Sequence, residues 1–292
     1  MTSVAGIIFV NPAAGPDDLS ADELRRRFSG HEVVECDPGE VGKRTTDAVR
    51  RGVDFVGVAG GDGTIRCAAE QLAGSDVPLL PIPAGTRNHF AKDLGVRELD
   101  DAVQAVQGRV VQVDVGEVND YRFLNNSSIG IYPRIVVRRE AHEHRLPKGI
   151  ANVVAVWEQV RRRGQRFGVD VDGRRHRAWM VFVGNGCYGE GLIDLADRES
   201  LSGNELDVRV ALADKPAARV RLLLALLVGR LSRSKLLVNM TTPDVCVDVE
   251  GTTSVEVALD GEVERLETPL RYRSVAGALS VLVPADRNTA ER

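Results

Sequence analysis

One carboxylate stands among three glycines early in the chain, in the pentapeptide Gly60-Gly61-Asp62-Gly63-Thr64. The glycines let the backbone turn sharply and approach a ligand closely, and the carboxylate of Asp62 can bind a cation or accept a proton. A mainly apolar run, residues 54–59, precedes the pentapeptide and predicts a buried strand that ends at Gly60. These features favour a loop that binds a nucleoside triphosphate.

Two further loops of small and amide-bearing residues follow predicted strands, at residues 11–15 and 83–88. Glycine and small side chains leave backbone N–H groups accessible to phosphate oxygens, and a helix that starts after such a loop turns its positive end toward an anion. Ligands of open parallel sheets bind beyond the carboxyl ends of the strands, so we expect the three loops to converge on one site. The chain contains no Gly-x-x-x-x-Gly-Lys-Ser/Thr sequence, which excludes a P-loop.

The composition limits the class of protein. A chain of 292 residues with 43% hydrophobic content can bury a core, and its length favours two domains. The net charge of -4 argues against a nucleic-acid binder. The N-terminus lacks a basic signal-peptide region, and the longest apolar run, 222–228, is too short to span a bilayer. We expect a cytoplasmic protein with four reduced cysteines, namely Cys36, Cys67, Cys187 and Cys246.

Strands and helices alternate through the first 118 residues. The expected strands are 6–10, 32–36, 54–60 and 78–82, and the expected helices are 21–28, 43–50, 65–72, 88–94 and 101–106. Ser20 and Glu23 form a capping-box signal before the first of these helices. This order predicts an N-terminal α/β nucleotide-binding domain, residues 1–118, with a doubly wound parallel sheet. We expect the C-terminal tail, residues 284–292, to pack back on it.

After residue 115 the pattern changes to alternating strands with turn signals such as Asp172-Gly173 and Asp260-Gly261. The candidate strands are 121–125, 166–171, 179–183, 206–211, 245–249, 255–259 and 279–283. They predict a second, all-β domain over residues 119–283, an antiparallel β-sandwich. Apolar and polar residues alternate up to Leu259, so Glu262 follows the point where a strand leaves the sheet and could present a carboxylate to a cleft. An ordinary hairpin turn is the alternative.

Three weaker signals each leave two interpretations open. His142 and His144 could bind a transition metal, or belong to a solvated charged surface. The arginines near 161–166 and 219–233 could contact anionic lipid headgroups, or lie on exposed helix surfaces. The leucine-rich segment 217–237 predicts a helix that lies either at a membrane interface or in the core.

These motifs together resemble the diacylglycerol kinase catalytic-domain superfamily, especially the soluble bacterial lipid kinases, with sphingosine and ceramide kinases as more distant relatives. The matching segments are 11–15, 60–64, 83–95, 114–119, 123–130, 183–185 and 259–262. NAD kinases and phosphofructokinases share the aspartate-glycine pentapeptide. The stretch from Gly85 to Ala91 and the late Asp260-Gly261-Glu262 are specific to lipid kinases.

The resemblance implies a cleft between the two domains and ATP- and Mg²⁺-dependent transfer of a γ-phosphoryl group to a hydroxyl of diacylglycerol or a related lipid alcohol. It implies catalytic roles for Asp62, which would also bind the metal, and for Glu262, which would accept the hydroxyl proton. The nucleotide-binding residues it implies are Asn11, Pro12, Ala13, Ala14, Gly15, Gly60, Gly61, Asp62, Gly63, Thr64, Gly85, Thr86 and Asn88. The expected partners are a lipid substrate of phospholipid biosynthesis, a transient membrane surface and a second copy of the chain, but no nucleic acid.

The chain departs from the family pattern at two places. Arg66-Cys67 stands where an Asn-Glu pair is usual, and Ser202-Gly203-Asn204 replaces the Asp-Asp-Gly of a structural magnesium site. The loss of both carboxylates argues against a cation there, with Ser200, Gly203 and Glu205 as remnants of the site. Two alternatives therefore stay open: an NAD-kinase-like enzyme acting on a soluble acceptor, and a nucleotide- or lipid-binding protein without turnover.

Overall fold

A computed structural model describes residues 6–11, 19–130, 166–189, 198, 200–213 and 237–285. The chain forms two compact units. Unit 1 comprises Met1–Val115, Ser200–Asn204 and Val275–Arg292, and unit 2 comprises Gly116–Glu199 and Glu205–Ser274. The division drawn from the sequence at residue 118 had instead placed residues 200–204 and 275–283 in the second domain. Unit 1 is therefore assembled from segments that are distant in the sequence.

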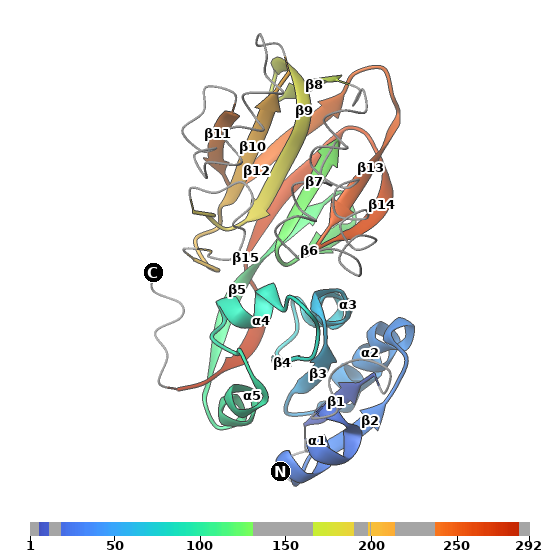
Figure 1. Ribbon diagram of the computed structural model, residues 1–292, viewed down its shortest axis with the longest axis vertical. Helices are drawn as coiled ribbons and strands as arrows, with labels where there is room; N and C mark the ends of the chain where they lie inside the picture. Colours follow the sequence, from blue (N-terminus) through green and yellow to red (C-terminus); the bar gives the residue numbers. More distant parts are fainter. Residues whose placement is uncertain are drawn as a thin grey trace, which may run out of the picture. The chain divides into compact units, whose positions relative to one another are not determined.

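Unit 1 contains an open parallel sheet (Figure 1). Its strands are β1 (Ile7–Val10), β2 (Glu32–Glu35), β3 (Val56–Gly60) and β4 (Leu79–Pro83). They lie in the order β2-β1-β3-β4, and the end of β15 (Leu270–Val283) joins β4 in parallel at Val281 and Leu79. The parallel sheet predicted from the alternation of strands and helices is confirmed.

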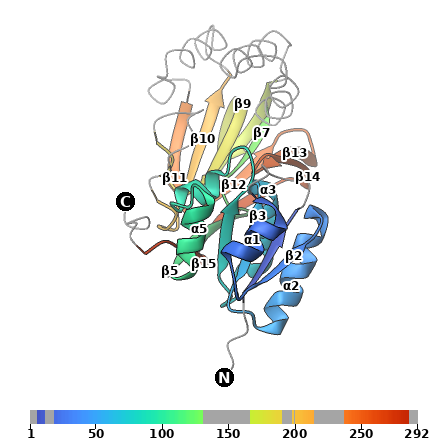
Figure 2. The same cartoon turned by 60° about the horizontal axis from the view of Figure 1, so that its bottom comes forward.

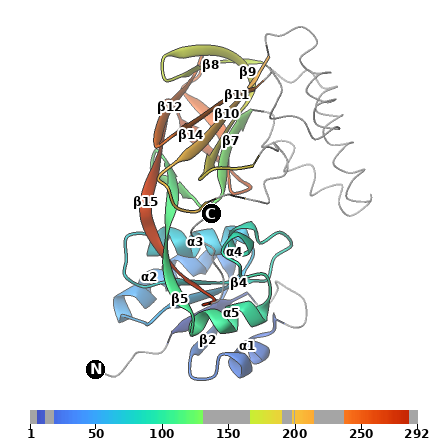
Figure 3. The same ribbon diagram turned by 90° about the vertical axis from the view of Figure 1, so that its left-hand side faces the viewer.

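Helices cover both faces of this sheet (Figure 3). They are α1 (Ala21–Arg27), α2 (Val41–Arg51), α3 (Asp62–Leu72), α4 (His89–Asp93) and α5 (Leu99–Val106), with a 3₁₀ turn, η2, at Pro38–Glu40. Alternate strand residues such as Ile8 and Leu80 point to one face and share a buried cluster with Leu24 of α1 and Ala102 of α5. The predicted cap of α1 is confirmed, because Ser20 Oγ accepts the Glu23 N–H at 3.2 Å.

Unit 2 is built from antiparallel strands (Figure 2). They are β6 (Tyr121–Phe123), β7 (Asn126–Gly130), β8 (Phe167–Val171), β9 (Arg174–Asn185), β10 (Leu206–Leu212), β11 (Leu237–Thr242), β12 (Asp244–Val249), β13 (Ser254–Leu259) and β14 (Glu262–Glu267), together with parts of β5 (Arg109–Val118) and β15. The sheet order is β14-β13-β7-β9-β8-β12-β15, and β10 lies between β9 and β11. Alternating apolar residues of these strands form one buried core, which explains the all-β pattern of this half.

The sequence missed or misplaced some elements. Three strands of unit 2, β7, β11 and β14, were not predicted, and α3 begins at Asp62 rather than at Ile65. The leucine-rich helix expected at 217–237, the pair His142 and His144, and the arginines at 161–163 fall outside the described residues, apart from Leu237 in β11. Within the described ranges, every helix is too short or too polar to cross a membrane.

The close approach of β15 to the start of β5 makes Gly108 a sensitive position. A Cβ at Gly108 would lie 2.0 Å from the carbonyl oxygen of Val283, so the backbone must move in a Gly108→Ala variant. We expect a loss of about 1–3 kcal/mol in the free energy of unfolding, measured by urea denaturation.

Gly39 provides the control, because a Cβ there meets nothing within 4 Å. The Gly39→Ala variant should change stability by no more than about 0.5–1 kcal/mol. Equal unfolding midpoints for the two variants would contradict the close contact at Gly108.

Candidate functional site

Two of the three candidate nucleotide loops pack backbone against backbone at the carboxyl edge of the unit 1 sheet. β3 ends at Gly60, and Gly61 is the extended N-cap residue of α3. A Cβ on Gly85 would lie 2.5 Å from the Cα of Gly61 and 2.9 Å from Oδ1 of Asn88. Only glycine at position 85 permits this approach, which brings the 60–64 loop and the 83–88 loop together.

Asp62 links these loops through its carboxylate. Its Oδ2 accepts the N–H of His89 at 3.2 Å, and its Oδ1 accepts the N–H of Phe90 at 3.1 Å. These donors belong to the first turn of α4, where N–H groups have no partner within the helix. Asp62 therefore accepts hydrogen bonds that hold the start of α4, in addition to any role toward a ligand. Local sequence patterns did not reveal this structural role.

Asn88 closes the second loop on itself. Its side chain accepts the N–H of Gly85 at 2.9 Å and donates to the Gly85 carbonyl oxygen at 2.7 Å. The residue has a φ of 52°, in the left-handed region that asparagine tolerates better than most residues. Asn88 is 7% exposed as a whole residue, so its amide holds the loop from a buried position.

The first turn of α3 has the properties of an anion site. Residues 61–64 are half-buried, and the helix behind them has 11 residues, which gives a full dipole at its N-terminus. Asn11 follows β1, and Val10 of β1 pairs in parallel with Ala59 of β3, so Asn11 lies at the same edge of the sheet. Pro12, Ala13, Ala14 and Gly15 lie outside the described residues.

The carboxylate of Asp62 could bind a magnesium ion that is held by a nucleotide. Each oxygen of Asp62 accepts one N–H, and a carboxylate has about four acceptor sites, so capacity for a cation is left. In the described ranges, no three His, Cys, Asp or Glu side chains are grouped to hold a metal. Asp62 would thus serve as a protein ligand of the ion, together with oxygen donors from the phosphates and water.

The loop that carries a structural magnesium ion in the family pattern does not fit a cation here. In this loop, residues 200–204, the backbone is bound by a carboxylate from β5: Asp114 Oδ2 accepts the Asn204 N–H at 2.6 Å. The other oxygen, Asp114 Oδ1, accepts the Gly277 N–H at 2.8 Å. Glu205 lies in unit 2, where its carboxylate contacts the Cys187 thiol at 3.0 Å. Residues 200–204 supply no carboxylate of their own.

The candidate base, Glu262, belongs to unit 2 and is exposed at the start of β14. The turn that precedes it contains Asp260 and Gly261, with φ values of 51° and 99°. Two successive residues with positive φ make the tight hairpin turn that joins β13 to β14, where Leu259 pairs with Glu262. The turn signal at Asp260-Gly261 is confirmed, and Glu262 opens the second strand of a hairpin, which is the alternative that the sequence left open. The role of Glu262 as a base stays a prediction.

Arg66, which departs from the family pattern, is 5% exposed on α3. Its Nε lies 3.8 Å from the carboxylate of Glu70, one helical turn later. Arg66 is thus buried, and the Glu70 carboxylate on the same helix partly balances its positive charge.

Burial lowers the pKa of His89, which donates its backbone N–H to Asp62, while the Asp62 and Asp93 carboxylates partly oppose this effect. The imidazole is therefore held neutral at pH values where an exposed histidine begins to protonate.

Two family descriptions match the chain. Residues 5–118 match "Diacylglycerol kinase catalytic domain", and residues 130–283 match "YegS C-terminal NAD kinase beta sandwich-like domain". The chain belongs to the diacylglycerol kinase catalytic-domain superfamily. Membership in this kinase family implies the use of ATP.

Relatives match over nearly the whole chain. A "Probable lipid kinase YegS-like" of Pseudomonas syringae pv. syringae (strain B728a) is 28% identical over 92% of this chain and 88% of its own length. A "Diacylglycerol kinase" of Mycobacterium tuberculosis (strain ATCC 25618 / H37Rv) is 28% identical over 89% of this chain and 87% of its own. A diacylglycerol kinase crystal structure from Bacillus anthracis str. Sterne shares the fold, with a TM-score of 0.70, 22% identity, and coverage of 97% and 98% of the two chains.

One further glycine pattern needs its structural context. The spacing Gly-x-Gly-x-x-Gly occurs at residues 184–189, but Gly184 lies inside the antiparallel strand β9. A dinucleotide fingerprint instead requires a parallel strand that leads into a helix. The spacing therefore gives no evidence for a dinucleotide site in this chain.

The neutral state of His89 predicts a pH-dependent stability. The unfolded chain binds a proton at His89 as the pH falls through about 6.5, whereas the native state takes it up only at lower pH, so acid favours unfolding. We expect the wild-type protein to lose more stability between pH 7.5 and pH 5.5 than a His89→Gln variant, measured by urea unfolding. Parallel losses in the two proteins would contradict a lowered pKa.

Proposed function

We propose that the protein is an ATP- and Mg²⁺-dependent lipid kinase that transfers the γ-phosphoryl group to a hydroxyl of diacylglycerol or a related lipid alcohol. One observation carries the proposal. The carboxylate of Asp62 joins the loop at the start of α3 to the loop at the start of α4, in a chain whose two halves both match this kinase family. The resulting edge of glycine backbone and helix N-terminus suits phosphate groups.

The nucleotide side of the reaction depends on unit 1. The N–H groups of the first turn of α3 would bind phosphate oxygens, and the Gly85–Asn88 loop would bind beside them. When bound, magnesium would neutralise charge on the phosphates, with Asp62 as its protein ligand. Because α4 is tethered to the same carboxylate, both loops would keep their positions relative to the bound phosphates.

The acceptor side depends on Glu262 in unit 2. Its carboxylate would accept the proton of the lipid hydroxyl as the new oxygen–phosphorus bond forms, and ADP would leave with the bond that breaks. A positioned base of this kind typically contributes about 10²- to 10⁴-fold to the rate. Its exposure at the end of a hairpin leaves it accessible to an acceptor.

The acceptor determines where the enzyme must work. Diacylglycerol resides in membranes, so the proposal includes a cytoplasmic protein that contacts the inner membrane face transiently, as part of phospholipid biosynthesis. A homodimer remains part of the proposal as well, since exposed strand edges can pair with a second copy.

The function is tested by incubating the protein with labelled ATP, Mg²⁺ and mixed micelles that contain diacylglycerol, sphingosine or another lipid alcohol. Labelled lipid with one of these acceptors is expected. If no acceptor is labelled while the protein remains folded, the lipid-kinase proposal fails.

A soluble acceptor is the second candidate, because the family description that matches residues 130–283 refers to NAD kinase. The same assay therefore includes NAD without micelles. Labelled NAD in place of labelled lipid would favour the NAD-kinase-like alternative. Calorimetric binding of nucleotide without any labelled product would favour a binding protein without turnover.

The proposed base predicts a specific loss. A Glu262→Gln variant should lower kcat by at least about 10²-fold, with little change in the KM for ATP, because the amide cannot accept the hydroxyl proton. The matched control is Glu267→Gln, which changes an exposed glutamate at the other end of β14 and should retain full activity. Full activity in the first variant would remove Glu262 from the base role.

A further inference from the structure

One carboxylate of unit 2 binds a whole connecting segment. Asp260 Oδ2 accepts the N–H of Leu124 at 2.7 Å, and Oδ1 accepts the N–H groups of Asn125 and Asn126 at 2.7 and 2.9 Å. The N–H of Asp260 donates in return to the carbonyl oxygen of Asn126 at 2.9 Å. A carboxylate is an acceptor at both oxygens, so it can satisfy three successive donors, which a side-chain amide with one oxygen cannot.

The carbonyl groups of the same connection are held from another direction. Asn185 Nδ2 and Arg198 both donate to the Leu124 carbonyl oxygen, at 3.0 and 2.6 Å. The Asn185 N–H and the Tyr188 hydroxyl donate to the Asn125 carbonyl oxygen, at 2.9 and 2.7 Å. The N–H groups of residues 124–126 are therefore bound by Asp260, and the carbonyl oxygens of Leu124 and Asn125 are bound by Asn185, Tyr188 and Arg198.

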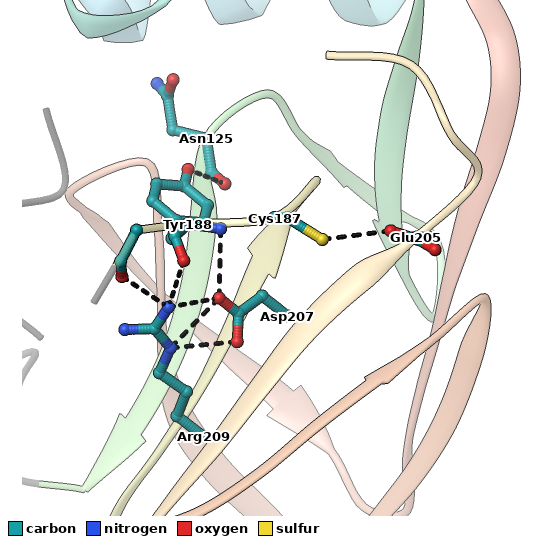
Figure 4. Close-up of polar contacts among 7 residues, drawn as sticks. Asn125, Cys187, Tyr188, Glu205, Asp207 and Arg209 are labelled. Carbon is teal, nitrogen blue, oxygen red and sulfur yellow. Dashed lines mark hydrogen bonds and ion pairs between the residues drawn. The ribbon is translucent and has the colours of Figure 1, made fainter. Parts of the chain in front are cut away.

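A buried ion pair supports this arrangement (Figure 4). Asp207 Oδ2 accepts the Tyr188 N–H at 3.1 Å, and Arg209 donates to the Tyr188 carbonyl oxygen at 2.7 Å. Arg209 and Asp207 are bonded to each other at 3.0 Å, and their side chains are only 6% and 10% exposed. Tyr188 is thus held through its backbone, and its hydroxyl in turn binds the Asn125 carbonyl oxygen in the segment 124–126.

Asp260 connects the segment 124–126 to the turn that leads to Glu262. Pairing between β13 and β7 reaches only Leu259 and Ser127, so the Asp260 contacts extend the attachment beyond the last strand pair. Within the described part of the sheet, β14 pairs only with β13. The start of β14 is therefore held by its hairpin partner and by the Asp260 carboxylate two residues away.

We propose that Asp260 is a positioning residue for Glu262, which sets the direction of the Glu262 carboxylate by anchoring the turn to the segment 124–126. This inference rests on the proposed function, in which Glu262 is the base. Asp260 acts through the turn, and it does not itself accept the proton.

The test compares Asp260→Asn with a matched control in the same unit. Asparagine retains the size of the side chain and tolerates the φ of 51°, but it replaces one acceptor oxygen by a donor. Asp172 also precedes a glycine in a hairpin turn, with a φ of 48°, and accepts the Cys246 N–H at 2.9 Å. Asp172→Asn thus makes the same change in a hairpin between other strands.

We expect Asp260→Asn to lower kcat about 10- to 100-fold with little change in the KM for ATP, because a base displaced by about 1 Å is inefficient. Asp172→Asn should retain kcat within about twofold. Asp260→Asn combined with Glu262→Gln should be no slower than Glu262→Gln alone, since one variant acts through the other. Effects that multiply would assign Asp260 a separate role and overturn the inference.

Hydrogen exchange gives a readout without turnover. Asp260→Asn should speed exchange of the N–H groups of Leu124, Asn125 and Glu262, whereas Asp172→Asn should leave them unchanged. Unchanged exchange in the first variant would contradict the anchoring. Loss of activity in Glu262→Gln with full kcat in Asp260→Asn overturns the inference alone, whereas a wild-type protein that labels no acceptor overturns the proposed function.

Discussion

In the described part of the chain, three connecting segments are held by hydrogen bonds from distant backbone N–H groups to an aspartate carboxylate. Asp62 accepts donors 27 and 28 residues later, Asp114 accepts donors 90 and 163 residues later, and Asp260 accepts donors 134 to 136 residues earlier. Charged acceptors make stronger hydrogen bonds than neutral ones, and one carboxylate can serve several donors. Each aspartate therefore fixes the backbone of a connecting segment against another part of the chain.

This constraint links structure to chemistry at Asp62 more than at the other two. The carboxylate that would bind magnesium is also the acceptor for the first turn of α4, so its orientation is fixed before a nucleotide arrives. Such preorganisation lowers the cost of ordering the site when charge must be stabilised. The close packing of Gly61 against Gly85 also brings the backbones of the two loops into direct contact.

Helices, strands and turns with a local sequence signal could be predicted, whereas features that depend on distant residues could not. The parallel sheet of unit 1 and the turn at Asp260 were predictable because apolar periodicity and glycine positions reveal them. β14 was missed because an edge strand with Glu262, Glu264 and Glu267 lacks an apolar run. The start of α3 was predicted three residues too late, because its glycine-rich first turn has the sequence of a loop. The contacts of Asp62 and Asp260 depend on partners far along the chain, which no local pattern specifies.

The loop at residues 200–204 shows how a departure from the family pattern can be accommodated physically. Its own sequence has lost the carboxylates that would attract a cation, yet its backbone remains fixed, because Asp114 accepts the Asn204 N–H and donates its own N–H to the Leu201 carbonyl oxygen at 2.8 Å. Asp114 is 4% exposed on β5, and it also accepts the Gly277 N–H from β15. The carboxylate that holds this loop therefore comes from the adjacent strand β5, and its charge makes these hydrogen bonds stronger than neutral ones.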